Sequence, residues 1–480
     1  MSAAGASTGP RPLPVRPRVA VVGSGISGLA AAWALRESAD VVLYEADDRP
    51  GGHAHTVDLT LDGIRHGVDT GFLVFNHATY PQLVRLFEQL QVPTAASDMS
   101  FSVQAPGAAG ATALEWSGHD LDSVFAQRRN LLRPRFWGML ADLLRFNRET
   151  TALATAPVPD GRQQAALAMP LGEYLQTGRY GAAFRDDYLL PMLGCIWSCP
   201  TEQMLRFPVA TMVRFCHNHG LIRVRQRPQW YTVSGGSREY VRRMVAALPD
   251  VRTGCPVQAL RREVDGVTLL TPQGPQRHDA VVLACHSDQA LRLLGEGAAA
   301  DERALLGAIG YHRNRAVLHT DVRQLPQRRK TWAAWNYERA AHAGTEQGAV
   351  CLHYLINRLQ PLPWAQPVVV SLNPVREIDG ACIHGEFDYA HPVFDAAAIA
   401  AQRRLPQIQG RDRIWFAGAW TGYGFHEDGL RSGLEAAEGV RAVCTPDPAA
   451  AGPRGERMVA PALPVATSAL AGAQAAHAGV

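Results

Sequence analysis

Three stretches of the chain share one pattern of hydrophobic and polar positions. Each has a run of aliphatic and β-branched residues, then a glycine turn, then residues typical of a helix, and they are residues 18–35, 233–248 and 413–443. A short apolar run that ends at glycines is typical of a buried strand followed by a covering helix. Further strands are expected at 41–45, around Val257, at 267–271 and at 280–285. The pattern predicts an α/β domain assembled from distant segments.

The remaining segments predict a second domain inserted into the first in two parts. Residues 79–229 and 293–404 carry most of the tryptophan, tyrosine and phenylalanine. The first domain then consists of residues 18–78, 230–292 and 405–444. Residues 1–17 and 445–480 are rich in small residues and proline and lack an apolar period, so a disordered leader and a disordered tail are expected.

Composition and charge narrow the class of protein. The chain has 480 residues, 47% of them hydrophobic, and a net charge of +3, as in a soluble globular protein of two or three domains. Lys330 is the single lysine among many arginines, and we do not interpret the arginines as a nucleic-acid footprint. Eight scattered cysteines favour a reducing cytoplasm. The uncharged run 19–35 is shorter than the roughly 20 residues of a membrane span and carries phosphate-binding glycines, so it is not interpreted as a targeting segment.

The first strand leads directly into a dinucleotide-binding turn, Gly23-Ser-Gly25-Ile26-Ser27-Gly28. In such a turn the first glycine makes the tight bend, the second lets the backbone approach a pyrophosphate, and the third lets the helix pack closely. The helix start at Ile26 and Ser27 offers free N–H groups to phosphates. Glu45 ends the next strand, where a carboxylate accepts hydrogen bonds from ribose hydroxyls, with Ala46 beside it.

The residues after this turn distinguish the cofactor. Glu45 is followed by Arg49, by the pair Gly51-Gly52, and then by Asp69-Thr-Gly-Phe72. This order resembles the FAD superfamily of flavin amine oxidases, protoporphyrinogen oxidases and phytoene-type desaturases. The resemblance implies an α/β fold, with a Rossmann-like, GR2-type FAD-binding domain and an inserted α+β substrate domain. It also implies that Glu45 binds the adenosine ribose, that Arg49 lies by the phosphates and ribityl chain, and that the glycine pair lies beside the flavin.

The resemblance continues in two later segments. The backbone of Val257 is implied to contact adenine, and the strand ending at Gly418 to close the flavin site. The family usually has an acid just after that glycine, whereas Ala419 and Trp420 stand here. We therefore expect the ribityl contact from Glu427 or Asp428, although Asp428 also suits the cap of the last helix. Leu430, at the start of that helix, completes the expected cofactor contacts.

The catalytic candidates are His53, His426 and Tyr337. His53 follows the glycine pair near the expected flavin ring, and His426 opens the last helix with two acids behind it. Tyr337 belongs to an aromatic group in the inserted domain that forms either the core or the wall of a long apolar pocket. Lys330 lies in a charge run, which argues against the flavin-facing lysine of several amine oxidases. No metal site is predicted, because the spacing of Cys195, Cys199, Cys216 and His219 suits a zinc knuckle poorly.

At a finer level the chain resembles a bacterial amine oxidase-like branch linked to cyclopropane or methylated fatty-acid metabolism. The stretches that carry this resemblance include 51–56, 69–80, 354–360 and 424–429. It implies an FAD-dependent oxidoreductase that takes hydride from a substrate C–H, with a lipid acyl chain as substrate and an unidentified electron acceptor. An amine oxidase and a non-catalytic flavoprotein scaffold are the alternatives. A helix over 133–144, with Phe136, Leu140, Leu143 and Leu144 in one stripe, either packs on its own domain or contacts a membrane surface.

Overall fold

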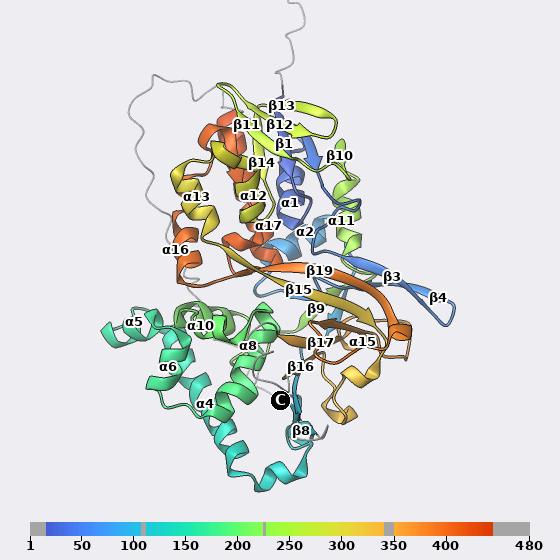
Figure 1. Ribbon diagram of the computed structural model, residues 1–480, viewed down its shortest axis with the longest axis vertical. Coiled ribbons are helices and arrows are strands. Elements are labelled where there is room, and N and C mark those ends of the chain that lie inside the picture. Colours follow the sequence, from blue (N-terminus) through green and yellow to red (C-terminus); the bar gives the residue numbers. More distant parts are fainter. Residues whose placement is uncertain (1–15, 107–111, 224–226, 340–349, 445–480) are drawn as a thin grey trace, which may run out of the picture. The chain divides into compact units, whose positions relative to one another are not determined.

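A computed structural model describes residues 16–106, 112–223, 227–339 and 350–444 of the chain (Figure 1). The predicted tail and all but two residues of the predicted leader lie outside these ranges. Within the described residues, no helix is both long enough and apolar enough to cross a bilayer.

Five parallel strands form one sheet in the order β10–β2–β1–β14–β20. They are β1 (Arg18–Val22), β2 (Asp40–Tyr44), β10 (Asp250–Arg252), β14 (Ala280–Leu283) and β20 (Ile414–Phe416). Because helices cover both faces, β1, β2, β14 and β20 are mostly apolar runs, whereas the edge strand β10 carries Asp250 and Arg252 and is only half-buried. Val19 and Val21 pack toward α1 (Ile26–Leu35) and α17 (His426–Cys444), whereas Ala20 and Val22 belong to the core on the other face. The expected α/β character with a parallel sheet is confirmed.

Three helices cover the other face of the parallel sheet, where Ala20 and Val22 lie. They are α12 (Ser287–Leu294), α13 (Ala300–Gly307) and α16 (Ala396–Arg404). An antiparallel sheet of β11 (Ala259–Arg262), β12 (Val267–Thr271) and β13 (Gly274–His278) lies beside them. Val257 was expected on a strand, but it lies in the loop that precedes β11.

A seven-stranded mixed sheet forms the second large layer, in the order β19–β15–β18–β17–β16–β7–β8. Its strands are β7 (Phe101–Pro106), β8 (Thr112–Ser117), β15 (Gly310–His319), β16 (Trp335–Glu338), β17 (Cys351–Leu355), β18 (Val369–Leu372) and β19 (Ile383–Val393). The long strands β15 and β19 pass beneath the parallel sheet in Figure 1. Short helix α15 (Ile356–Leu359) follows β17.

Smaller elements connect these two layers. The hairpin of β3 (Thr56–Leu61) and β4 (Ile64–Asp69) precedes a three-stranded sheet of β5 (Phe75–Asn76), β9 (Trp230–Val233) and β6 (Thr94–Ser97). Helices α2 (Pro81–Gln89) and α11 (Arg238–Val245) follow β5 and β9. The segment that begins at Val233 was expected to repeat the strand, glycine turn and helix of residues 18–35. Its strand β9 instead pairs antiparallel with β5 and β6 and does not join the parallel sheet.

A helical lobe completes the structure. Its elements are α3 (Leu121–Val124), the 3₁₀ turn η2 (Arg128–Leu132), α4 (Pro134–Thr155), α5 (Gly161–Ala168), α6 (Leu171–Thr177), α7 (Ala182–Phe184), α8 (Leu190–Trp197), α9 (Thr201–Leu205) and α10 (Val209–Asn218). In the predicted α4 stripe, Phe136, Leu140 and Leu143 pack on the protein. Leu144 was placed in the same stripe, but it is 58% exposed; it stands about 100° round the helix axis from Leu143 and about 80° from Phe136, at the edge of the stripe.

Candidate active site

The three glycines of the first turn have different surroundings. Gly23 has φ of +100°, and a Cβ there would lie 2.7 Å from the carbonyl oxygen of Ala284. At Gly28 a Cβ would lie 1.8 Å from the carbonyl oxygen of Gly23. At Gly25 no atom of the described residues lies within 4 Å of an added Cβ, and Gly25 lines a cavity. Two glycines are therefore needed by the fold, and the middle one leaves space for a ligand.

The acid after β2 lies against this turn. Glu45 Oε2 accepts hydrogen bonds from the backbone N–H of Ser24 at 2.8 Å and from the Ser24 hydroxyl, and Oε1 accepts from the N–H of Asp47 at 3.0 Å. Glu45 and Ala46 line the cavity together with Ile26 and Ser27 at the start of α1. The helix N-terminus and the carboxylate therefore face the same space, as a pyrophosphate and a ribose require.

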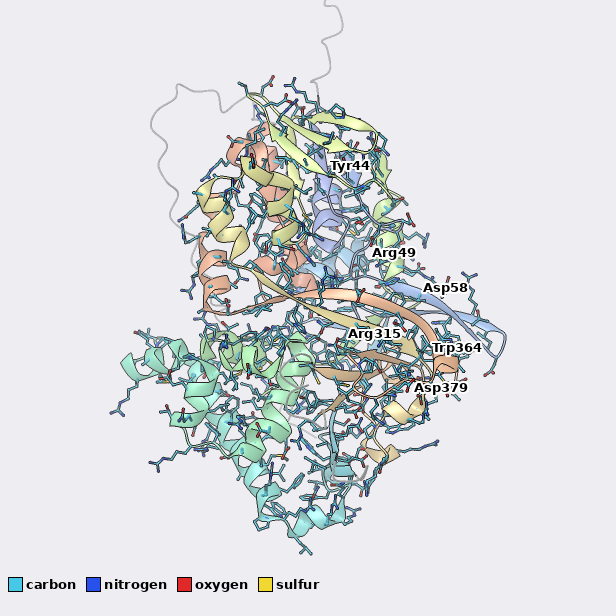
Figure 2. All side chains as sticks on the ribbon, in the orientation of Figure 1. Tyr44, Arg49, Asp58, Arg315, Trp364 and Asp379 are labelled. Atoms are coloured by element: carbon cyan, nitrogen blue, oxygen red, sulfur yellow. The ribbon has the colours of Figure 1, made fainter. Side chains whose placement is uncertain are left out.

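The Gly51-Gly52 loop lies across the turn. Gly51 N–H donates to the Ser24 carbonyl at 3.1 Å, and both residues have positive φ, +117° and +56°. Arg49 donates twice to the Gly52 carbonyl at 3.0 Å and is not among the cavity-lining residues, so it holds the loop from behind. The expected place of Arg49 by the phosphates and ribityl chain stays a prediction. Figure 2 shows Arg49 between Tyr44 of the parallel sheet and the long strands below.

A single continuous cavity of about 730 Å³ extends from this loop into the second layer. Gly51, Gly52, His53, Val257, Gly418 and His426 line it at the loop end and in the middle. Its far end is apolar and aromatic, with lining residues Met99, Ile196, Trp197, Phe215, Leu221, Trp230, Trp335, Tyr354 and Leu372. Gly28 and Leu430, expected as cofactor contacts, are not among the lining residues. Gly28 packs within its own turn, and Leu430 is buried in α17.

The middle of the cavity is lined by histidines. The ring of His53 lies 5.4 Å from that of His391 and 6.4 Å from that of His286. His53 Nε2 is buried and has no hydrogen-bond partner among the described residues. Burial, followed by the neighbouring imidazoles, lowers the pKa of His53 well below its ordinary value. These rings are therefore neutral at pH 7 and offer one donor and one acceptor nitrogen each.

His426 also reaches the cavity wall, from the first turn of α17. Its ring stacks on Phe72 with centroids 3.7 Å apart, and its Nε2 is 3.0 Å from the hydroxyl of Tyr240. Burial lowers the pKa of His426 to about 3. Of the three catalytic candidates, His53 and His426 lie at the cavity. Tyr337 does not line it. It is buried on β16 near Gly194, and Trp335 of the same strand lines the cavity instead.

The two acids of α17 have structural roles, which corrects their expected contact with a ribityl chain. Glu427 accepts from the backbone N–H groups of Gln82 and Leu83 at 2.9 and 3.0 Å and so caps α2. Asp428 accepts from the N–H groups of Tyr423 and Phe425 and from Arg431. Their carboxylates are used within the fold because helix starts leave N–H groups that need acceptors.

Sequence reasoning missed an amide chain that orients His391. Arg315 N–H donates to Asn373 Oδ1 at 2.9 Å, and Asn373 Nδ2 donates to Asn314 Oδ1 at 2.7 Å. Asn314 Nδ2 therefore faces His391 Nδ1, 2.8 Å away, as a donor. Neutral His391 then carries its proton on Nε2. No sequence motif marks this chain, because its members come from three strands or their ends.

Asn314→Asp is expected to reverse this tautomer. The aspartate presents an acceptor to Nδ1, so the proton moves to Nδ1 and the pKa of His391, which burial lowers to about 4, rises. The ¹⁵N shifts of histidine-labelled protein report both changes directly. Asn357→Asp is the matched control, because Asn357 bonds to the backbone of Trp364, Gln366 and Val368. Unchanged ¹⁵N shifts in Asn314→Asp would disprove the proposed hydrogen bond from Asn314 to His391.

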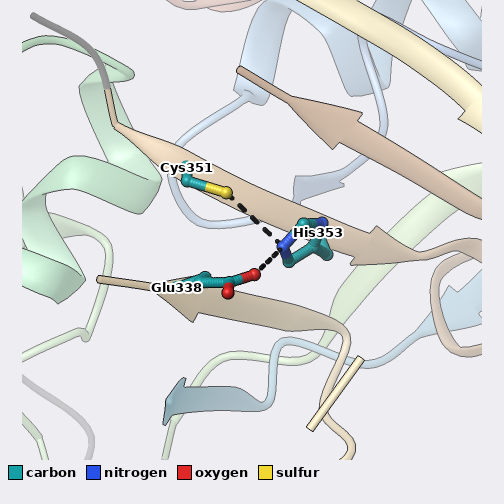
Figure 3. Close-up of side chains that lie close together, drawn as sticks. All are labelled: Glu338, Cys351 and His353. Carbon is teal, nitrogen blue, oxygen red and sulfur yellow. Dashed lines mark hydrogen bonds and ion pairs between the residues drawn. The ribbon is translucent and has the colours of Figure 1, made fainter. Parts of the chain in front are cut away.

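One group of potential metal ligands occurs in the described part of the chain, and Figure 3 shows it: Glu338, Cys351 and His353. The carboxylate of Glu338 is 2.9 Å from His353 Nε2 and accepts from Arg376 at 2.7 and 2.8 Å. His353 Nδ1 bonds to Ser371 Oγ at 2.6 Å. Burial raises the pKa of the Cys351 thiol. The lone pairs of the Glu338 carboxylate and of His353 already take part in hydrogen bonds, and the guanidinium of Arg376 lies beside them. We therefore assign this group a structural role in the seven-stranded sheet.

Comparison with known proteins identifies the family. The pattern described as "Flavin containing amine oxidoreductase" matches residues 26–312, which is more than half of the chain. The chain belongs to this family. It is therefore an FAD-dependent oxidoreductase, as the resemblance implied. No curated protein gives a significant sequence match.

Solved structures share the fold of this oxidoreductase at low identity. A putative protoporphyrinogen oxidase from Exiguobacterium has 20% identity and a TM-score of 0.60, covering 89% of this chain and 99% of its own. A fatty acid isomerase from P. acnes that produces CLA has 15% identity and a TM-score of 0.61, with coverages of 88% and 98%. A putrescine oxidase variant has 17% identity and a TM-score of 0.64, with coverages of 89% and 99%.

The site described above fits FAD. The open space at Gly25, the N-terminus of α1 and the carboxylate of Glu45 suit a pyrophosphate and a ribose. FAD, when bound, supplies the hydride acceptor of the reaction. In this oxidoreductase the described lysine, Lys330, pairs with Asp122 at 3.4 Å and does not line the cavity.

Proposed function

We propose that this oxidoreductase desaturates an acyl chain of a lipid. FAD, when bound, would accept a hydride from one acyl carbon, and the adjacent carbon would lose a proton to a neutral histidine or water, so that a C=C bond would form. An acceptor such as oxygen or a quinone would then take the two electrons. The bacterial lipid-linked branch that the sequence resembles supports this choice, as does a neighbour in fold that is named as a fatty acid isomerase.

The polar atoms at the far end of the cavity carry this proposal. Among the described lining residues there, none bears a carboxylate, and the acids Glu45 and Asp47 lie at the glycine-loop end. Trp197 and Trp335 line this end, and their indole N–H groups, which are donors, are buried with no partner among the described residues. The hydroxyls of Ser198 and Tyr354, which also line the cavity, can donate or accept. An ester or carboxyl oxygen accepts from the indole N–H groups, whereas an ammonium group is itself a donor and needs acceptors. The apolar wall between them suits a hydrocarbon chain.

The histidines provide a route for the proton. The imidazoles of His53 and His391 are neutral. His53 Nε2 has no partner among the described residues, so this nitrogen can accept a hydrogen bond or pass a proton to water. His426 is held by Tyr240 and Phe72, which fixes its ring in the wall. We assign proton handling to His53 and a positioning role to His426.

Anaerobic reduction of the bound flavin tests the substrate class. Phospholipid with unsaturated or methylated acyl chains is expected to bleach the absorbance near 450 nm in stopped flow, whereas putrescine and simple primary amines are not. Trp335→Phe removes one N–H donor and keeps a smaller aromatic ring, so it is expected to weaken the lipid response about fivefold, the usual value of one neutral hydrogen bond. Trp332→Phe, outside the cavity lining, is the control.

The alternatives make different predictions in the same experiment. Rapid bleaching by amines, with none by lipid, establishes an amine oxidase and refutes the desaturase. A yellow protein that neither class of compound reduces indicates a non-catalytic scaffold.

A further inference from the structure

The helical lobe ends in a tip with apolar side chains in solvent. We define the α3–α4 tip as residues 121–137, at the lower end of the molecule in Figure 1. Leu121 is 78% exposed, Leu132 is 87% exposed, and Leu131 and Trp137 are about half exposed. Trp137 Nε1 donates to the Leu131 carbonyl at 2.9 Å, which holds the indole beside the leucines. A patch of this kind on one tip marks an interaction surface.

The same tip is strongly basic. Between Leu121 and Trp137 the chain has four arginines and one acid, Asp122, which gives a net charge of +3. Arg128 pairs with that acid. Exposed leucines and tryptophan among arginines are the combination that binds the interface of an anionic membrane, where apolar groups enter and guanidiniums remain at the headgroups.

A pocket of about 160 Å³ opens beside the start of α4. Arg133, Arg135 and Arg339 line it, with one acid, Asp187, which bonds to Arg135 at 2.9 Å and to Arg339 at 2.6 Å. Three guanidiniums against one carboxylate leave the pocket positive. The positive end of the 22-residue helix α4 adds to this field.

An unpartnered donor in the wall of this pocket indicates a ligand. Asn130 is fully buried and lines the pocket. Its Oδ1 accepts from Arg133 at 3.5 Å, whereas its Nδ2 has no partner among the described residues. A buried N–H without an acceptor is costly. A phosphate oxygen satisfies both the amide and the excess positive charge.

We propose that the α3–α4 tip docks on a membrane containing anionic phospholipid. The pocket beside Asn130 takes a headgroup phosphate, while Leu131, Leu132 and Trp137 enter the interface. This inference is independent of the acyl-chain proposal, since it concerns another surface. It assigns a function to the exposed apolar residues that the packing of α4 leaves unexplained.

Vesicle flotation of the FAD-loaded full chain tests the docking. Binding is expected to phosphatidylglycerol-containing vesicles, more weakly to phosphatidylcholine alone, and to decrease with salt. Leu132→Glu and Arg133→Glu are each expected to reduce binding to the anionic vesicles about tenfold or more, because each removes an inserted or attracted group. Val264→Glu and Arg261→Glu are matched controls, since both residues are exposed at the other end of the molecule.

Several results would overturn the proposal. One is equal binding of the protein to neutral and anionic vesicles. Another is no binding to either kind of vesicle, and a third is tip variants that bind anionic vesicles as tightly as the control variants do. A thermal shift with inorganic phosphate but no vesicle binding would show a site for free phosphate only. Loss of a dimer in Leu132→Glu, measured by light scattering, would show an interface between copies. Flavin content and bleaching in Leu132→Glu are expected to stay unchanged, so failure here leaves the proposed function standing.

Discussion

Gly25→Val is expected to fold normally and to purify almost without flavin. Gly25 has an extended backbone, with φ of −61° and ψ of 175°, and nothing lies within 4 Å of an added Cβ, so the fold accepts a side chain. The side chain then fills the space where the pyrophosphate must approach α1. We expect FAD affinity to fall at least about 100-fold, roughly 2.7 kcal/mol, as measured by flavin release and titration, with the melting temperature of the apoprotein unchanged.

Two further glycine variants distinguish a filled binding site from a damaged fold. Gly310→Val introduces the same side chain into open space outside the cavity lining, so it should retain its flavin. Gly28→Val places a Cβ 1.8 Å from the Gly23 carbonyl oxygen and should lower the stability of the apoprotein itself. Full flavin content in Gly25→Val would show that the cavity at this turn does not hold the pyrophosphate.

Asp69→Ala is expected to cause the largest loss of stability among single polar substitutions. Asp69 is buried and accepts hydrogen bonds from the Thr56 hydroxyl at 2.5 Å, from Ser237 N–H and hydroxyl, and from Gln360 Nε2 at 2.7 Å. These partners come from β3, the start of α11 and the end of α15, so one carboxylate connects distant segments. Leaving several buried donors unpaired is expected to reduce the free energy of unfolding by about 3 kcal/mol or more, measured by denaturant titration.

The pH dependence provides a second check on Asp69. Burial raises the pKa of its carboxyl to about 6, above the ordinary value, so between about pH 4 and 6 the folded chain holds a proton that the unfolded chain has lost. The stability from this group therefore falls as the pH rises through that window. The difference in unfolding free energy between wild type and Asp69→Ala should narrow from pH 5 to pH 7. Asp388→Ala, at an exposed position, is the control, and an equal loss there would contradict the assignment.

Local sequence patterns determined the parts of the fold that depend on neighbours along the chain. The apolar run of β1, the glycine turn and α1 follow one another within 18 residues, so strand, turn and helix could be predicted together. Glu45 could be placed because a strand of fixed length carries it to the same sheet edge. Val257 lines the cavity, although the strand predicted around it is a loop; its backbone contact with adenine stays a prediction.

Only the tertiary structure decided which side chains face the cavity and which bond elsewhere. Glu427 and Asp428 have the right chemistry for a cofactor, but packing of α17 against α2 and its own preceding loop uses their oxygens. His391 and Asn314 lie 77 residues apart and become partners only through the pairing of β15 with β19. The sequence determined where the glycine turn lies between β1 and α1. Strand register and helix packing determined the wall of the cavity, because contacts between distant segments leave no local pattern to read.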